Sequence, residues 1–322
     1  MAQATTRRAL AGLLLAVPAA AQQPWPDHAV RIVAPFAPGG NTDLVARLIA
    51  AHLAPALGQP VVVENKPGAN TIVGTQAVLA APADGNTWLL ATGAPVTVNP
   101  LLYKRLPYAA GDLTLGAVQA LMPMLPVVAA NSPFRTLADL RAAAAARPGA
   151  LNFSSAGNGN STHLVGELFC QQTGVRMTHV PFNGSAPALL AVVRGDAQVS
   201  FDIISSSIQL IRDGALRALA VTTAERIPAL PDLPTAREQG FADFVVVGWV
   251  GIALSSRTPP AVLARLRAAL AELQRKPEFI AGIANLGLLP TEPRDAAGLA
   301  QFAAADRATW SQVIQANAIS LD

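Results

Sequence analysis

Residues 34–47 read APFAPGGNTDLVAR, and this stretch decides how the chain around it folds. The preceding residues 30–33, VRIV, are rich in β-branched side chains and predict a strand. Two prolines and the pair Gly39 and Gly40 then interrupt regular structure and permit positive φ. Asn41 or Thr42 can cap a following helix. The stretch is therefore typical of a strand, a glycine turn and a helix.

The turn between this strand and this helix is a candidate anion site. The first backbone N–H groups of a helix have no partner within the helix, and the helix dipole is positive at that end. Residues 34–42 contain no Lys or Arg. An anion held here would therefore be bound mainly by backbone dipoles.

A second stretch with the same pattern lies at residues 154–164, SSAGNGNSTHL. Its glycines, Gly157 and Gly159, follow a predicted strand at 150–154, and polar residues able to cap a helix come next. Two ordinary strand-to-helix turns would show the same pattern. If the two loops face each other, two helix N-termini meet one ligand, which suits a carboxylate or a dicarboxylate.

The rest of the chain alternates segments of strand and helix character. Further strands are predicted at 61–64, 87–91, 125–130, 178–180, 198–201, 216–221 and 244–254. Helices are predicted at 42–53, 71–80, 137–146, 161–172, 186–194, 205–213, 259–274, 277–286 and 295–315. This order favours an α/β fold with parallel strands and helices on both faces of the sheet.

Two segments would carry the chain between two α/β lobes. We expect residues 22–124 and 247–322 to form lobe 1 and residues 125–246 to form lobe 2, with a hinge and a cleft between them. Ligands of open α/β sheets bind beyond the carboxyl ends of the strands. Both glycine loops would therefore lie at the cleft.

Residues 1–21 have the pattern of a secretory signal peptide. Arg7 and Arg8 precede an apolar core at 9–17, and three alanines place the cleavage site after Ala21. This core is too short to span a membrane as a helix. The general secretory route fits best, a twin-arginine route stays open, and a short N-terminal helix is the alternative interpretation.

Composition limits the classes of partner. The chain is 52% hydrophobic and 13% charged, which favours a packed globular body. Without Arg7 and Arg8, 21 Lys and Arg stand against 20 Asp and Glu, so no nucleic-acid partner is expected. Cys170 is the only cysteine, cannot form an internal disulfide and is expected to be buried. The histidines show no metal-ligand spacing, and we expect no cofactor.

Other chemistries fit the glycine loops less well. Segment 156–162 lacks the Gly-Lys-Ser/Thr ending of a phosphate-binding loop and the third glycine of a dinucleotide fingerprint. Ser161 and His163 raise the alternative of an exported serine esterase or amidase. No nucleophile elbow surrounds Ser161, however, and helical residues two apart do not face each other. His163 can instead pair with Glu167, one helical turn further on.

Taken together, these motifs resemble the receptors of the tripartite tricarboxylate transporter family, the Bug-type binding proteins. The resemblance covers essentially the whole mature chain and rests on 35–47, 63–74 (VENKPGANTIVG), 81–89 (APADGNTWL), 155–164, 181–184, 195–202, 228–234 and 238–240. It implies a two-lobed periplasmic binding protein of type II-like, Venus flytrap architecture with two hinge crossings. Such a receptor closes around a small organic acid and delivers it to membrane permease subunits, as a monomer and without catalysis.

The resemblance also implies which residues line the cleft. We expect a first-lobe wall and a second-lobe anion end, with further residues setting selectivity. The first-lobe wall comprises Phe36, Pro38, Gly39, Gly40 and Asp43. The second-lobe anion end comprises Gly157, Asn158, Gly159, Asn160, Ser161 and Thr162. The residues expected to set selectivity are Thr92, Phe182, Asn183, Gly184 and Asp202. Where the family usually has Tyr-Lys/Arg-Gly, this chain has Phe182-Asn183-Gly184, which removes a cation. A further interpretation is a sensor subunit that presents its ligand to a histidine kinase.

Overall fold

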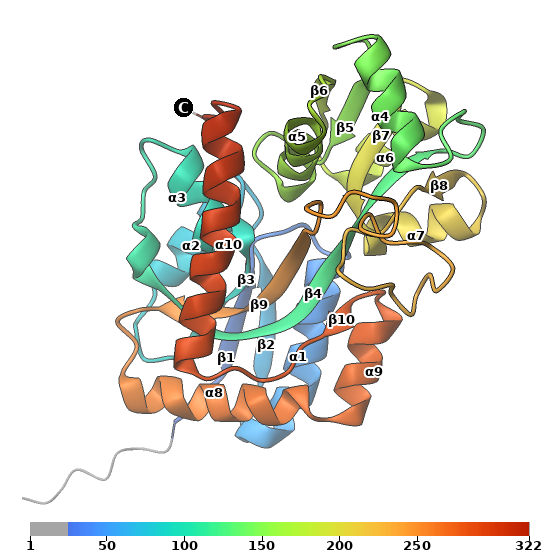
Figure 1. The fold of residues 1–322 in the computed structure, drawn as a ribbon. Helices are drawn as coiled ribbons and strands as arrows, with labels where there is room; N and C mark the ends of the chain where they lie inside the picture. The colour runs from blue at the N-terminus through green and yellow to red at the C-terminus, as the bar shows by residue number, and fades with distance from the viewer. Residues whose placement is uncertain (1–24, 322) are drawn as a thin grey trace, which may run out of the picture.

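A single long strand, β4 (Leu113–Ala129), connects two sheets. The computed structural model describes residues 25–321, and the predicted signal peptide at 1–21 lies outside these described residues. The first part of β4 pairs with β9 (Val247–Ser255) in one sheet, and the end of β4 pairs with β7 (Val199–Ile203) in the other. Figure 1 shows β4 running diagonally from the lower part of the molecule into the upper part.

The first sheet confirms the predicted parallel arrangement near the N-terminus. β1 (Val30–Ala34) pairs in parallel with both β2 (Val61–Asn65) and β3 (Thr87–Thr92), and β9 and β4 extend the sheet in antiparallel fashion. The short β10 (Leu289–Pro290) pairs with β4.

In the second sheet, β7 pairs in parallel with β5 (Asn152–Ser155), and β5 pairs in parallel with β6 (Thr178–Pro181). The short β8 (Leu216–Ala218) pairs with β4.

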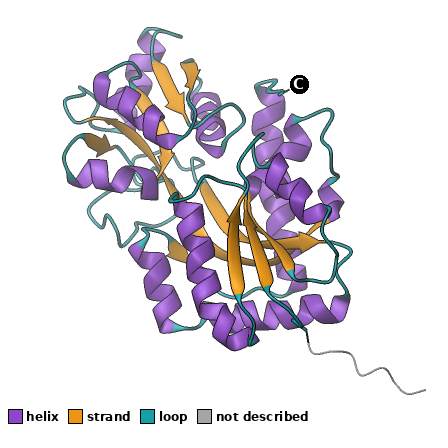
Figure 2. Ribbon diagram, turned by 180° about the vertical axis from the view of Figure 1, so that it is seen from behind, coloured by secondary structure: helices purple, strands orange, loops and turns teal. Residues whose placement is uncertain are grey.

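Helices cover both sheets, as Figure 2 shows from behind. They are α1 (Asn41–Leu57), α2 (Ile72–Leu79), α3 (Asn99–Leu102), α4 (Leu137–Ala146), α5 (Ser161–Thr173), α6 (Ser185–Arg194), α7 (Ile204–Arg212), α8 (Pro260–Gln274), α9 (Pro277–Asn285) and α10 (Ala296–Ala316). A π-helical turn, Ala94–Val98, follows β3, and a 3-10 turn, Ala110–Asp112, precedes β4. Among the described helices, none combines the length and apolar character needed to cross a membrane.

The strand β4 is much longer than the segment 125–130 that its sequence suggests. It starts at Leu113 because residues 113–123 find their hydrogen-bond partners in β9, a segment distant in sequence. Register shifts between Leu115 and Ala117, and between Val118 and Ala120, mark irregularities that interrupt strict alternation. Pro123 and Pro126 also lie within β4, although proline in a sequence usually argues against the interior of a strand.

The C-terminal helix α10 packs into the apolar cores of both sheets. Near its start, Leu299 joins a cluster that includes Trp249 of β9. Towards its end, Trp310 and Val313 join the cluster around Phe153 of β5. Because one rigid helix contributes to both cores, α10 connects the two parts of the molecule in addition to the strands.

Candidate functional site

A cleft lies at the carboxyl ends of the strands, where the sequence places the two glycine loops. It has an inner pocket of about 90 Å³ and an outer groove of about 910 Å³. The two hollows are adjacent, because they share the lining residues Phe36, Thr42, Asn70, Met122, Asn160 and Ile203. Residues from both glycine loops line the outer groove.

The N-terminal ends of α1, α2, α5, α6 and α7 line the outer groove. The residues that precede α1, α6 and α7 are Gly40, Gly184 and Ile203, and none of them caps its helix with a side-chain hydrogen bond. No Lys, Arg, Asp or Glu is among the described residues that line this groove. The groups that would favour an anion here are therefore the helix dipoles and backbone N–H groups.

Asp43 supports the first loop from behind and does not line the cleft. Its side chain is buried, and its Oδ2 accepts hydrogen bonds from the Gly39 N–H and the Arg47 Nε, both at 2.9 Å. Its Oδ1 accepts from Asn65 Nδ2 at 2.9 Å. Burial acts to raise the pKa of Asp43, but the hydrogen bonds from Arg47, Gly39 and Asn65 hold it below its usual range. Asp43 is thus an ionised brace that fixes the glycine turn.

Thr162 has the equivalent supporting role in the second loop. It is fully buried, and its Oγ1 accepts a hydrogen bond from the Ala156 N–H at 2.8 Å. Asn160 caps α5, with its Oδ1 accepting from the Thr162 N–H at 3.2 Å. The Ser161 hydroxyl donates to the same Asn160 oxygen at 3.2 Å, and no histidine in the described part of the chain accepts from it. Ser161 therefore lacks the base that a serine nucleophile needs.

Two stacked histidines lie beneath the second loop. The rings of His163 and His179 are 3.7 Å apart between centroids. His163 Nδ1 accepts from the Gly159 N–H at 3.1 Å, and its Nε2 lies 3.5 Å from Glu167, the predicted partner. His179 Nε2 is 2.6 Å from the Ser155 hydroxyl, and burial together with His163 lowers the pKa of His179 to about 3. His163 therefore holds the second loop through the Gly159 N–H, and the His179 ring stacked on it is neutral.

Asp202 is buried behind the cleft wall. Its Oδ1 accepts from the Ser185 hydroxyl at 2.8 Å and from the Ile203 N–H at 2.7 Å. Its Oδ2 is buried and has no hydrogen-bond partner in the structure. Burial raises the pKa of Asp202 to about 6, against the two hydrogen bonds. Asp202 positions the starts of α6 and α7, which line the groove.

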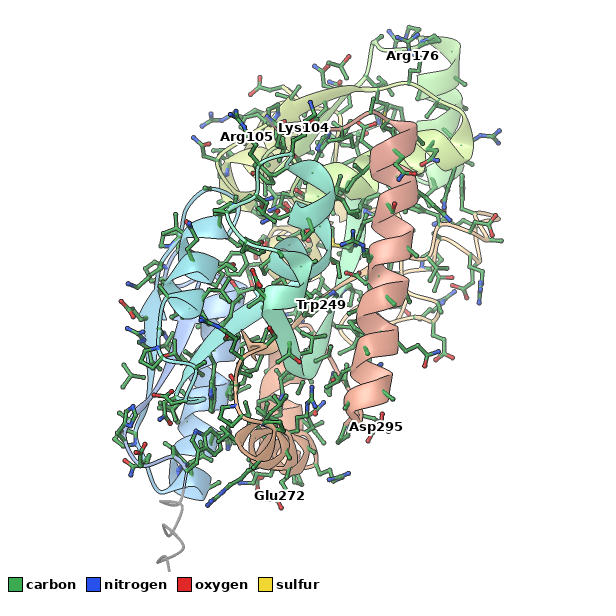
Figure 3. The ribbon with its side chains drawn as sticks, turned by 90° about the vertical axis from the view of Figure 1, so that its left-hand side faces the viewer. Lys104, Arg105, Arg176, Trp249, Glu272 and Asp295 are labelled. Atoms are coloured by element: carbon green, nitrogen blue, oxygen red, sulfur yellow. The ribbon has the colours of Figure 1, made fainter. Side chains whose placement is uncertain are left out.

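The inner pocket is also lined by residues outside the predicted site, of which Asp306 and Trp310 carried no sequence-based expectation. Asp306 and Trp310 of α10 line it, together with Trp249 of β9. Figure 3 shows Trp249 at mid-height in the molecule, beside the helix that begins after Asp295. A spacing of four residues places Phe302, Asp306 and Trp310 on one face of α10, but this pattern does not show what that face packs against.

Most of the predicted site residues line the cleft, and four do not. Those that line it are Phe36, Pro38, Gly39, Gly40, Thr92, Gly157, Asn158, Gly159, Asn160, Ser161, Asn183 and Gly184. Asp43, Thr162 and Asp202 lie behind the wall, and the half-buried Phe182 lines neither hollow. Within residues 25–321, no group of three or more His, Cys, Asp or Glu side chains could hold a metal ion.

Comparisons with known proteins identify relatives of the same kind. Residues 45–319 match the family described as "Tripartite tricarboxylate transporter family receptor". A UPF0065 protein from the tcbD-tcbE intergenic region of Pseudomonas sp. (strain P51) is 36% identical, over 88% of this chain and 86% of that protein. BugT of Bordetella pertussis is 32% identical, over 83% of this chain and 82% of BugT. The structure of R. palustris Rpa4515 with adipate has a TM-score of 0.84 at 33% identity, and the match covers 92% of this chain and 99% of that one.

Proposed function

We propose that this chain, which belongs to the tripartite tricarboxylate transporter family of receptors, captures a small organic acid and delivers it to the membrane permease of such a transporter. Its relatives are periplasmic solute-binding proteins and not enzymes, and its α/β fold is that of a two-lobed periplasmic binding protein. For this chain we infer export to the periplasm with cleavage near Ala21, and action as a monomer.

The observation that carries this proposal is the outer groove, where five helix N-termini meet and no described lining residue is basic. Such a surface favours a small anion that accepts hydrogen bonds from backbone N–H groups. Gly39, Gly40 and Gly157 lack side chains, so a carboxylate can approach the backbone closely. The bound adipate of the R. palustris neighbour supports an organic acid as the ligand class.

Closure would follow from the way the chain crosses between sheets. We infer that residues 22–124 with 247–322 form one lobe and residues 125–246 the other. β4 changes partners from β9 to β7 near Met124, and β9 starts at Val247, so both crossings lie at one level of the molecule. A ligand that bridges the two glycine loops would stabilise the closed arrangement of a hinge at these crossings.

A thermal-shift screen of the chain without residues 1–21 tests the proposal. A carboxylate that binds only the folded protein at 100 times its Kd should stabilise it by about 2.7 kcal/mol, and so raise the Tm. Mono- and dicarboxylates of two to eight carbons and aromatic acids form the panel, and matched amides are the controls. No shift with any acid would overturn the proposal. So would turnover of a nitrophenyl ester that is lost in Ser161→Ala, because it would indicate an esterase.

A further inference from the structure

We propose that Asp306 determines which organic acids the cleft accepts. In this proposal Asp306 selects a ligand whose end opposite the carboxylate carries a hydrogen-bond donor, and it disfavours a second ionised carboxylate. The inference rests on the proposed function, because it assumes that one carboxylate occupies the helix N-termini of the outer groove. It then assigns the other end of the same ligand to the inner pocket.

Asp306 is placed to contact a ligand. It is half-buried and lines the inner pocket from α10. Its Oδ1 accepts from Trp310 Nε1 at 3.1 Å, and its Oδ2 accepts from the Thr97 hydroxyl. A carboxylate has about four acceptor sites on its two oxygens, so this group retains capacity for a ligand N–H or O–H.

Three polar atoms converge beside Gly93, where the chain leaves space by having no side chain. A Cβ at Gly93 would lie 3.4 Å from Asp306 Oδ2, 3.5 Å from Thr97 Oγ1 and 3.6 Å from Trp249 Nε1. Trp249 is 1% exposed, and its indole N–H has no hydrogen-bond partner within residues 25–321, although Asp306 Oδ2 lies beside the same space at Gly93. A buried donor without a partner is costly. A ligand group that donates to Asp306 and accepts from Trp249 would satisfy both side chains.

The charge of the cleft opposes a second carboxylate. Among the described residues that line the inner pocket and the outer groove, Asp306 is the only charged one. Burial raises the pKa of Asp306, against the hydrogen bonds from Thr97 and Trp310. A ligand carboxylate beside Asp306 would add a like charge without compensation, whereas an ammonium or amide N–H would pair with it.

The test compares acids that differ only at the far end. Isothermal titration of the wild-type chain would use butanoate, 4-aminobutanoate, succinamate and succinate, and the six-carbon set hexanoate, 6-aminohexanoate, adipamate and adipate. The amine or the amide of at least one set should bind at least tenfold more tightly than its dicarboxylate. Asp306→Asn should reduce that ratio at least tenfold. Asp232→Asn, which alters an exposed acidic residue that lines neither hollow, should leave it unchanged.

The outcomes separate this inference from the proposed function. If succinate or adipate binds the wild-type chain as tightly as its amine and amide, the role of Asp306 is overturned while carboxylate binding stands. An unchanged ratio in a folded Asp306→Asn chain also overturns it. If Asp306→Asn does not fold, the order of the wild-type affinities decides. If no acid of either set or of the wider panel binds, the proposed function fails and this inference fails with it.

Discussion

Replacing Asp202 with asparagine should change how the stability of this protein depends on pH. Asp202 is fully buried, its Oδ2 has no hydrogen-bond partner among residues 25–321, and burial raises its pKa from 3.8 to about 6. The folded chain therefore holds this proton more tightly than the unfolded chain does. As the pH rises from about 4 to about 6, the unfolded state loses the proton first, and folding stability falls.

The size of the effect follows from the two pKa values. A carboxyl whose pKa rises from 3.8 to about 6 on folding costs about 3 kcal/mol once it is ionised in both states. Near pH 4 and below, Asp202→Asn should resemble the protonated wild type. At pH 7 the variant should be more stable than the wild type by up to about 3 kcal/mol, because an amide has no charge to bury.

Urea unfolding between pH 3.5 and 7.5 measures this difference. The free energy of unfolding of the variant minus that of the wild type should rise through this range and level off above pH 6. The matched control is Asp196→Asn, which changes an exposed carboxyl shortly before β7, the strand that carries Asp202. This control should show no such rise. A difference that stays constant with pH would refute the reasoning that burial keeps Asp202 protonated.

Three further substitutions test the two loops. Gly40→Val should fold with an unchanged Tm, because Gly40 has φ −73° and a Cβ there meets only the Ala37 carbonyl oxygen at 3.5 Å. The variant should lose the thermal shift with carboxylates, because the side chain would block the anion's approach to the loop. Wild-type affinity would show that Gly40 is not at the anion site. Gly159→Ala should lower stability by about 1–3 kcal/mol in urea unfolding, since Gly159 has φ +70° and its Cβ would lie 2.5 Å from Leu321 Cδ1. A stability equal to that of the wild type would contradict this strain. His163→Phe keeps an aromatic ring but removes the acceptor of the Gly159 N–H. Carboxylate binding, measured by titration calorimetry, should therefore weaken by about 1–3 kcal/mol. An unchanged affinity would rule out the proposed support of the loop by His163.

Much of the fold could be predicted because its signals are local. A strand, a glycine turn and an amphipathic helix are recorded in adjacent residues, so the α/β order and both glycine loops were correctly placed. The burial of Cys170 was predicted from its apolar neighbours on α5 and is confirmed. β4 was predicted too short because its first half pairs with β9, and that pairing depends on residues more than a hundred positions away.

Side-chain roles at the site could be predicted only in part. An Asp or Thr near a helix start can cap the helix, brace a loop or contact a ligand, and the sequence pattern is the same for all three. Asp43, Thr162 and Asp202 point behind the wall, and only their hydrogen bonds in the folded chain reveal this direction.

The sequence by itself thus determined the two glycine loops that we propose as the anion site, because glycine and capping residues act on the few residues beside them. Tertiary structure alone decided what faces those loops. Asp306 and Trp249 come from α10 and β9, and they reach the inner pocket only because these elements pack against β3 and its following turn. A contact between residues so distant in sequence depends on the packing of the whole chain, and no local pattern records it.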